Sequence, residues 1–141
     1  MERSQKLPHL HPMMVHFPQG LFPVAFASFA LYLLTGLPDF ETGAYTAALF
    51  GLILIPTCVV TGFVDWKLRY KGAMTKVFKI KIAGSFILLA FAIPAVLIRC
   101  THPHLMAGAV QGLGLLYAAL LAACLATCVV LGYYGGRLVF H

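Results

Sequence analysis

The stretch AGAVQGLGLLYAALLAACLATCVVLGYY (107–134) contains no charged residue. At 1.5 Å of rise per helical residue, it is long enough to cross about 30 Å of membrane hydrocarbon. Three further predominantly apolar stretches cover residues 13–36, 44–65 and 80–99. The chain is 61% hydrophobic and 10% charged, which is outside the range of soluble domains. We therefore expect a single domain over residues 1–141, an all-α integral membrane four-helix bundle.

The distribution of basic residues predicts the orientation of this bundle. Six of the ten lysines and arginines lie between the second and third spans: Lys67, Arg69, Lys71, Lys76, Lys79 and Lys81. Such a bias is typical of cytoplasmic loops. It predicts that both termini and this loop lie in the cytoplasm, and the short connectors predict an up-down-up-down order of the spans. Anionic lipid headgroups account for the net charge of +6, so the expected partner is the bilayer and not nucleic acid.

Small residues in the fourth span predict how the helices pack. Gly108 and Gly112 are four residues apart, and they are followed by Gly114, Ala118, Ala122 and Ala126, which are again spaced by four. Helices in lipid associate where small residues let their backbones approach closely. We therefore expect this row to face the other helices, and leucine substitutions at Gly112 or Ala122 to force them apart.

Polar side chains from all four spans are expected at the cytoplasmic end. They are His9, His11, His16, Asp65, Lys81, Arg137 and His141. Pro12 suits the first position of a helix, which would place His11 at the N-cap and His16 inside the membrane. Ionisable groups at membrane depth are candidates for function. We therefore interpret His16 as the functional histidine, facing Asp65, with Lys81 and Arg137 as supporting residues; His102 and His104 belong to the opposite end.

Several motifs resemble a bacterial membrane protein family of the DUF2231 type, whose members open with HPxxVHFP. The matching segments are HPMMVHFPQGL (11–21), LLTG (33–36), TGFVDWKLRYKG (61–72) and YGGRLVFH (134–141). The resemblance implies a four-helix inner-membrane module, in some members fused to cytochrome-type heme domains, and hence an electron-transfer context. Many members carry a histidine early in the third span, where this chain has Lys79 and Lys81.

Three functions remain open from the residues. A b-type heme could be held by His16 and His141 as iron ligands, with His11 as a substitute, and the same histidines could instead bind a quinone oxygen. Either role implies a redox protein as partner. The segments HPMMVH and HPHLM mix histidine with methionine, which suits copper. A non-catalytic membrane anchor without cofactor is the third reading. No hydrolase triad, phosphate-binding loop or paired-carboxylate motif is present, so we do not expect an autonomous enzyme.

Overall fold

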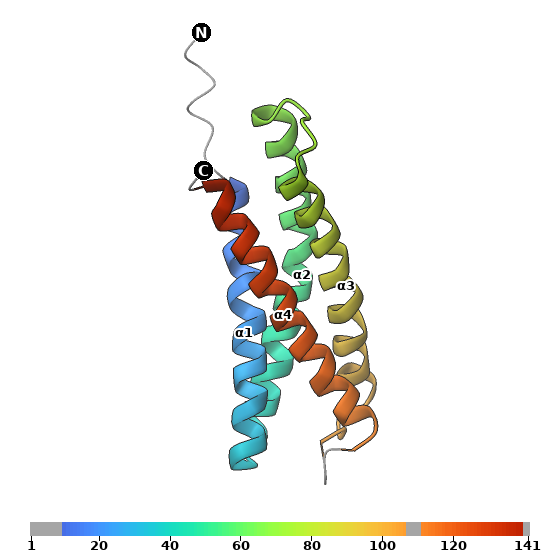
Figure 1. Cartoon of the computed structure of the whole chain (residues 1–141). Helices are drawn as coiled ribbons and strands as arrows, with labels where there is room; N and C mark the ends of the chain where they lie inside the picture. Colours follow the sequence, from blue (N-terminus) through green and yellow to red (C-terminus); the bar gives the residue numbers. More distant parts are fainter. Residues whose placement is uncertain (1–9, 107–110, 140–141) are drawn as a thin grey trace.

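The computed structural model describes residues 10–106 and 111–139. They form four antiparallel α-helices: α1 (Leu10–Thr35), α2 (Pro38–Arg69), α3 (Lys76–Thr101) and α4 (Leu113–Val139). Each helix is long and apolar enough to cross a membrane, and no strand occurs among these residues. The helices run up, down, up and down, as the sequence predicts (Figure 1).

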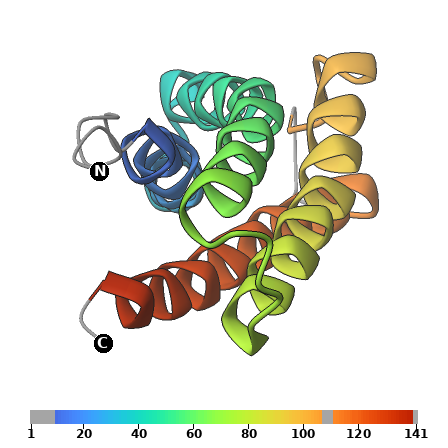
Figure 2. The ribbon, with the colours of Figure 1, turned by 90° about the horizontal axis from the view of Figure 1, so that it is seen from above.

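The four helices pack as two neighbouring pairs. α1 lies along α2, and α3 lies along α4, while α4 leans across the bundle (Figures 1 and 2). It begins beside the end of α3 and finishes at the same end of the bundle as the start of α1. We call the end of the bundle that holds the loop between α2 and α3 the basic end. The start of α1 and the end of α4 lie at the same end.

The helices differ from the expected spans mainly at their boundaries. Residues 38–43 belong to α2 and not to a turn. Gly36 turns the chain at a φ of +70°, Leu37 is the N-cap, and Pro38 begins the helix. At the start of α3, the Thr75 side chain caps the helix by accepting a hydrogen bond from the Phe78 amide at 3.4 Å. α4 begins at Leu113, later than predicted, and residues 107–110 lie outside the described residues.

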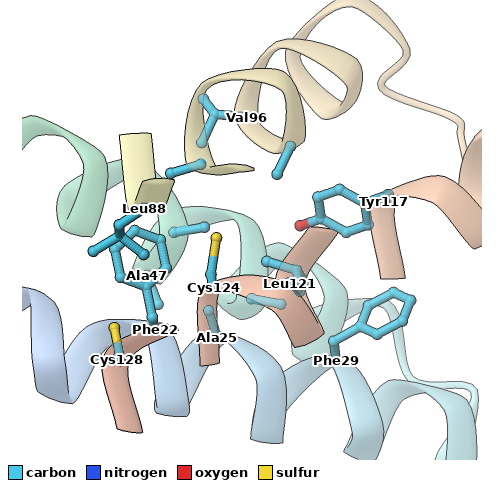
Figure 3. Close-up of a cluster of buried hydrophobic side chains, with 14 of the residues drawn as sticks. Phe22, Ala25, Phe29, Ala47, Leu88, Val96, Tyr117, Leu121, Cys124 and Cys128 are labelled. Carbon is cyan, nitrogen blue, oxygen red and sulfur yellow. The ribbon is translucent and has the colours of Figure 1, made fainter. Parts of the chain in front are cut away.

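Large side chains at the centre of the bundle form its core. The largest fully buried ones are Tyr117, Phe22, Phe29, Leu121 and Cys124 (Figure 3). The ring of Tyr117 meets that of Phe29 edge to face, with centroids 5.5 Å apart. Aromatic rings of α1 and α4 therefore meet in a core to which all four helices contribute.

The predicted packing face of α4 was wrong for most of the helix. The large buried side chains of α4 are Tyr117, Leu121, Cys124, Cys128 and Leu131. Gly114 is buried and Ala118 packs against the core, but Ala122 and Ala126 are exposed. Gly112 is also exposed, and Gly108 lies outside the described residues. The reason is helical geometry. A row at constant intervals of four drifts around the helix, while alternating steps of four and three stay on one side.

Candidate ligand pocket at the basic end

A pocket of about 330 Å³ lies among the helices toward the basic end. Most of its lining side chains are aliphatic or aromatic. The side chains with nitrogen, oxygen or thiol groups come from the first three helices: His11, Gln19, Cys58, Trp66, Lys81 and Ser85. α4 contributes Leu131. Ligand sites in proteins commonly combine such apolar walls with a few polar groups.

Part of the pocket wall lies on the outer surface of the bundle. Val59 and Phe63 of α2 and Ile82 and Phe86 of α3 line it, and all four side chains are exposed on the outer surface of the bundle. These residues lie within the apolar parts of their helices, where the surroundings are lipid. A ligand dissolved in the bilayer could therefore enter between α2 and α3 without crossing water.

His11 is held against the α2 backbone. Its Nδ1 lies 3.1 Å from the carbonyl oxygen of Cys58 and 3.4 Å from the hydroxyl of Thr61. Gly62 allows this close approach, since a Cβ placed there would lie only 2.8 Å from Cε1 of the imidazole. Because a carbonyl oxygen can only accept, Nδ1 carries the proton in this arrangement and Nε2 is left as an acceptor.

Lys81 of α3 meets that acceptor inside the pocket. Its Nζ donates to His11 Nε2 at 3.4 Å. Asp65 of α2 is close enough for its charge to act on both His11 and Lys81, and its carboxylate also lies 3.6 Å from Nε of Arg69 one turn later. The ammonium has three donors, and His11 occupies one of them. The site therefore presents a positive hydrogen-bond donor at one end of an apolar space.

A proline and a thiol adjust the backbone beside this pair. Pro18 has no amide hydrogen, so the carbonyl of Met14, four residues earlier in α1, lacks its usual helical partner. The Cys58 thiol of α2 donates to that oxygen at 3.2 Å. This contact joins α1 to α2 one turn below His11 and satisfies the acceptor that the proline leaves behind.

The structure places His11, and not His16, beside Asp65 and Lys81. His16 is exposed, and its Nδ1 donates to the carbonyl oxygen of Pro12 in its own helix. Five residues rotate an α-helix by about 140° beyond one full turn, so the two histidines face opposite directions. The expected contact between His16 and Asp65 was therefore wrong.

Three other predicted residues, Arg137, His102 and His104, are not part of the pocket lining. Arg137 is exposed and its guanidinium stacks on Tyr133, at 6.0 Å from the ring centroid. His102 and His104 are exposed at the opposite end of the bundle, as expected. His141 lies outside the described residues, so its proposed role as an iron ligand stays a prediction. Within residues 10–106 and 111–139, no three His, Cys, Asp or Glu side chains gather as a metal site.

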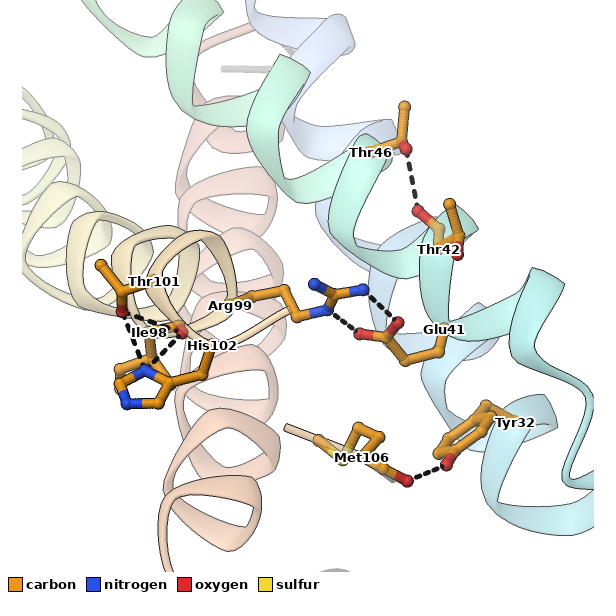
Figure 4. Close-up of polar contacts among 9 residues, drawn as sticks. All are labelled: Tyr32, Glu41, Thr42, Thr46, Ile98, Arg99, Thr101, His102 and Met106. Carbon is orange, nitrogen blue, oxygen red and sulfur yellow. Dashed lines mark hydrogen bonds and ion pairs between the residues drawn. The ribbon is translucent and has the colours of Figure 1, made fainter. Parts of the chain in front are cut away.

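The sequence reasoning missed an ion pair at the opposite end. Arg99 of α3 and Glu41 of α2 form two parallel hydrogen bonds, the one between Nη2 and Oε2 measuring 2.7 Å (Figure 4). Glu41 is 5% exposed, and the guanidinium also lies 5.3 Å from the ring centroid of Tyr45. The sequence contained a signal for this pair. In an up-down-up-down bundle, the acid at the start of the second span and the arginine at the end of the third lie at the same end of the bundle.

The chain belongs to the family described as Predicted membrane protein (DUF2231), whose family model matches residues 7–141. No curated protein and no solved structure matches the chain. The family membership agrees with the four membrane-spanning helices and identifies a multi-pass membrane protein.

Proposed function

We propose that this membrane protein is a small redox-associated module of the bacterial inner membrane that binds a lipid-soluble quinone in the pocket at its basic end. One observation carries the proposal: Lys81, bonded to His11, lines a largely apolar pocket whose walls include exposed apolar side chains of α2 and α3. A quinone matches this site because it dissolves in the bilayer and presents carbonyl oxygens that accept hydrogen bonds.

The charge of Lys81 would favour the reduced form of such a ligand. An electron added to a quinone places negative charge on its oxygens, and a nearby ammonium stabilises that charge strongly where water is excluded. A redox protein partner would supply or remove the electron. The chain's own residues would bind the ring, orient it and provide the positive charge.

A b-type heme fits the described residues less well. Such a heme is held by axial ligands on its iron, and His11 is the one histidine among the described residues that lines the pocket. Its Nε2 already accepts from Lys81, which an iron ligand could not do. A heme site would therefore require this contact to break and a second ligand from elsewhere.

A built-in fluorophore makes the quinone proposal testable. Trp66 is the chain's single tryptophan, it lines the pocket, and its indole nitrogen donates to the Ala73 carbonyl at 3.0 Å. Decylubiquinone titrated into the protein in lipid nanodiscs should quench Trp66 fluorescence saturably. Lys81→Met should weaken binding by about tenfold or more, because a hydrogen bond from a charged donor is lost. His11→Ala should also weaken it, while His16→Ala, at an exposed position on the same helix, should not.

The same preparation separates the competing functions. An absorption spectrum of oxidised and dithionite-reduced protein should show no heme band. A heme band that disappears in His11→Ala would show that the pocket binds heme and not a quinone. Absence of both a heme band and saturable quenching would leave a structural anchor subunit as the better reading.

The orientation in the membrane has its own test. The basic residues around the loop between α2 and α3 predict that this end is cytoplasmic. A reporter active only outside the cytoplasm should give signal when fused at Thr42 or Thr101 and none at Gly72. Signal at Gly72 would invert the orientation and place the pocket near the outer face.

A further inference from the structure

Gln19 is a polar side chain for which the helix packing offers no explanation. It lies in α1 well inside the membrane span, is partly buried and lines the pocket. Among the described residues its amide makes no hydrogen bond, unlike the side chains of Thr61, Ser85 and Thr127, which all bond to backbone carbonyls. An unpaired amide in hydrocarbon is costly, which makes it a candidate for ligand binding.

The amide lies deeper in the pocket than the pair formed by His11 and Lys81. Gln19 follows His11 by eight residues, which is about 12 Å along the helix axis. Val15 and Pro18 line the pocket between them. A Cβ placed on Gly132 of α4 would lie 3.9 Å from the Gln19 amide nitrogen, so this end of the pocket borders α4 next to Leu131. The α1 wall is therefore polar at both ends and apolar between them.

Polar groups at the two ends of an apolar wall suit a ring with two opposed carbonyl groups. The oxygens of a para-quinone point in opposite directions, so donors at both ends are needed to hold both of them. The Lys81 ammonium can donate at the outer end. The Gln19 amide nitrogen can donate at the inner end, with the apolar floor of α1 against the ring.

We infer that Gln19 is a specificity-determining residue that donates a hydrogen bond to the inner carbonyl of the ligand, so that the pocket selects para-quinones over rings with one carbonyl. This inference rests on the proposed function, because it assigns the second contact of the same ligand. It differs from a structural role for Gln19 in predicting that the effect of a substitution depends on the ligand.

The experiment compares two ligands in two proteins. The ligands are 2-decyl-1,4-naphthoquinone and 2-decyl-1-tetralone, which lacks the second carbonyl. The affinity of each is measured by its competition with decylubiquinone for quenching of Trp66 in nanodiscs. Wild-type protein should prefer the naphthoquinone. Gln19→Met, similar in length but without a donor, should weaken the naphthoquinone by about three- to tenfold and leave the tetralone unchanged within about twofold.

A matched control comes from the same depth of the bundle. Thr127→Val also removes a polar group from a span, at a residue outside this pocket, and should change neither affinity. Equal weakening of both ligands by Gln19→Met, or no change in either, would overturn the assignment of Gln19 while decylubiquinone still bound through His11 and Lys81. If wild-type protein showed no saturable quenching, the proposed function would fail and this inference with it.

Discussion

The two ends of the bundle use buried charge differently. At one end, Glu41 and Arg99 face each other with both carboxylate oxygens paired, and the carboxylate is nearly inaccessible. At the basic end, Lys81 has His11 as its direct partner, with Asp65 acting from farther away, and it borders an open pocket. A paired charge of the first kind joins helices and leaves little to offer a ligand. A cation with unused donors beside an apolar space is suited to binding one.

Removal of one partner of the Glu41–Arg99 ion pair should have the largest effect on stability. We call the end of the bundle that holds this pair the closed end. Arg99→Ala would leave the Glu41 carboxylate buried without its partner, which costs about 3–5 kcal/mol. The free energy of unfolding in mixed micelles, measured by circular dichroism, checks this. Arg99→Ala combined with Glu41→Gln should recover part of the loss, because no charge is then left unpaired. A loss below about 1 kcal/mol in the single variant would mean that the pair does not join α2 to α3.

The core between the two ends should respond next. Leu121→Ala would open a cavity at a fully buried position and should cost about 2–5 kcal/mol. Ala122→Leu, one residue later on the exposed side, should change stability by less than about 0.5 kcal/mol. This order is the reverse of the one that the small-residue row predicts. Thermal unfolding of the two variants in detergent distinguishes them, and a larger loss in Ala122→Leu would restore the row as a packing face.

A single methyl group added at Gly62 should disturb the contact between His11 and Lys81 at the basic end. In Gly62→Ala the new Cβ would lie 2.8 Å from the His11 ring, which costs about 1–3 kcal/mol and displaces the imidazole from Lys81. Quenching of Trp66 by decylubiquinone should weaken along with stability. Gly20→Ala is the control, since nothing lies within 4 Å of its new methyl group. Unchanged ligand affinity in Gly62→Ala would show that the position of His11 does not matter for binding.

The smallest effect concerns a hydroxyl near the closed end. Tyr117 is fully buried, and within the described residues its hydroxyl is the one buried side-chain oxygen or nitrogen without a hydrogen-bond partner. Tyr117→Phe keeps the ring against Phe29 and removes the unpaired group, so stability should rise by about 1 kcal/mol. Chemical unfolding in mixed micelles measures the change. A loss of stability would mean that a bound water satisfies this hydroxyl.

The sequence was sufficient to predict the architecture but not which histidine turns toward the bundle. Long apolar stretches and short connectors predict four antiparallel helices, and the structure confirms them. The motif that contains His11 and His16 also supplies a residue of the pocket lining, His11. Pro12, the second residue of that motif, suggested that the helix would begin there and that His11 would be its N-cap. In the structure α1 already begins at Leu10, so His11 is helical and turns toward the bundle while His16 turns away.

What the sequence alone determined is the set of properties that depend on residues close together in the chain: helix length, hydropathy and the charge of each loop. What the tertiary structure decided is which face of each helix turns inward, and therefore that His11 meets Lys81 across 70 residues and Glu41 meets Arg99 across 58. In a membrane, apolar side chains are equally acceptable against lipid and against another helix. Hydropathy therefore does not reveal which face of a helix is buried. That face is set by the fit of side chains such as Phe22, Tyr117 and Leu121 between helices.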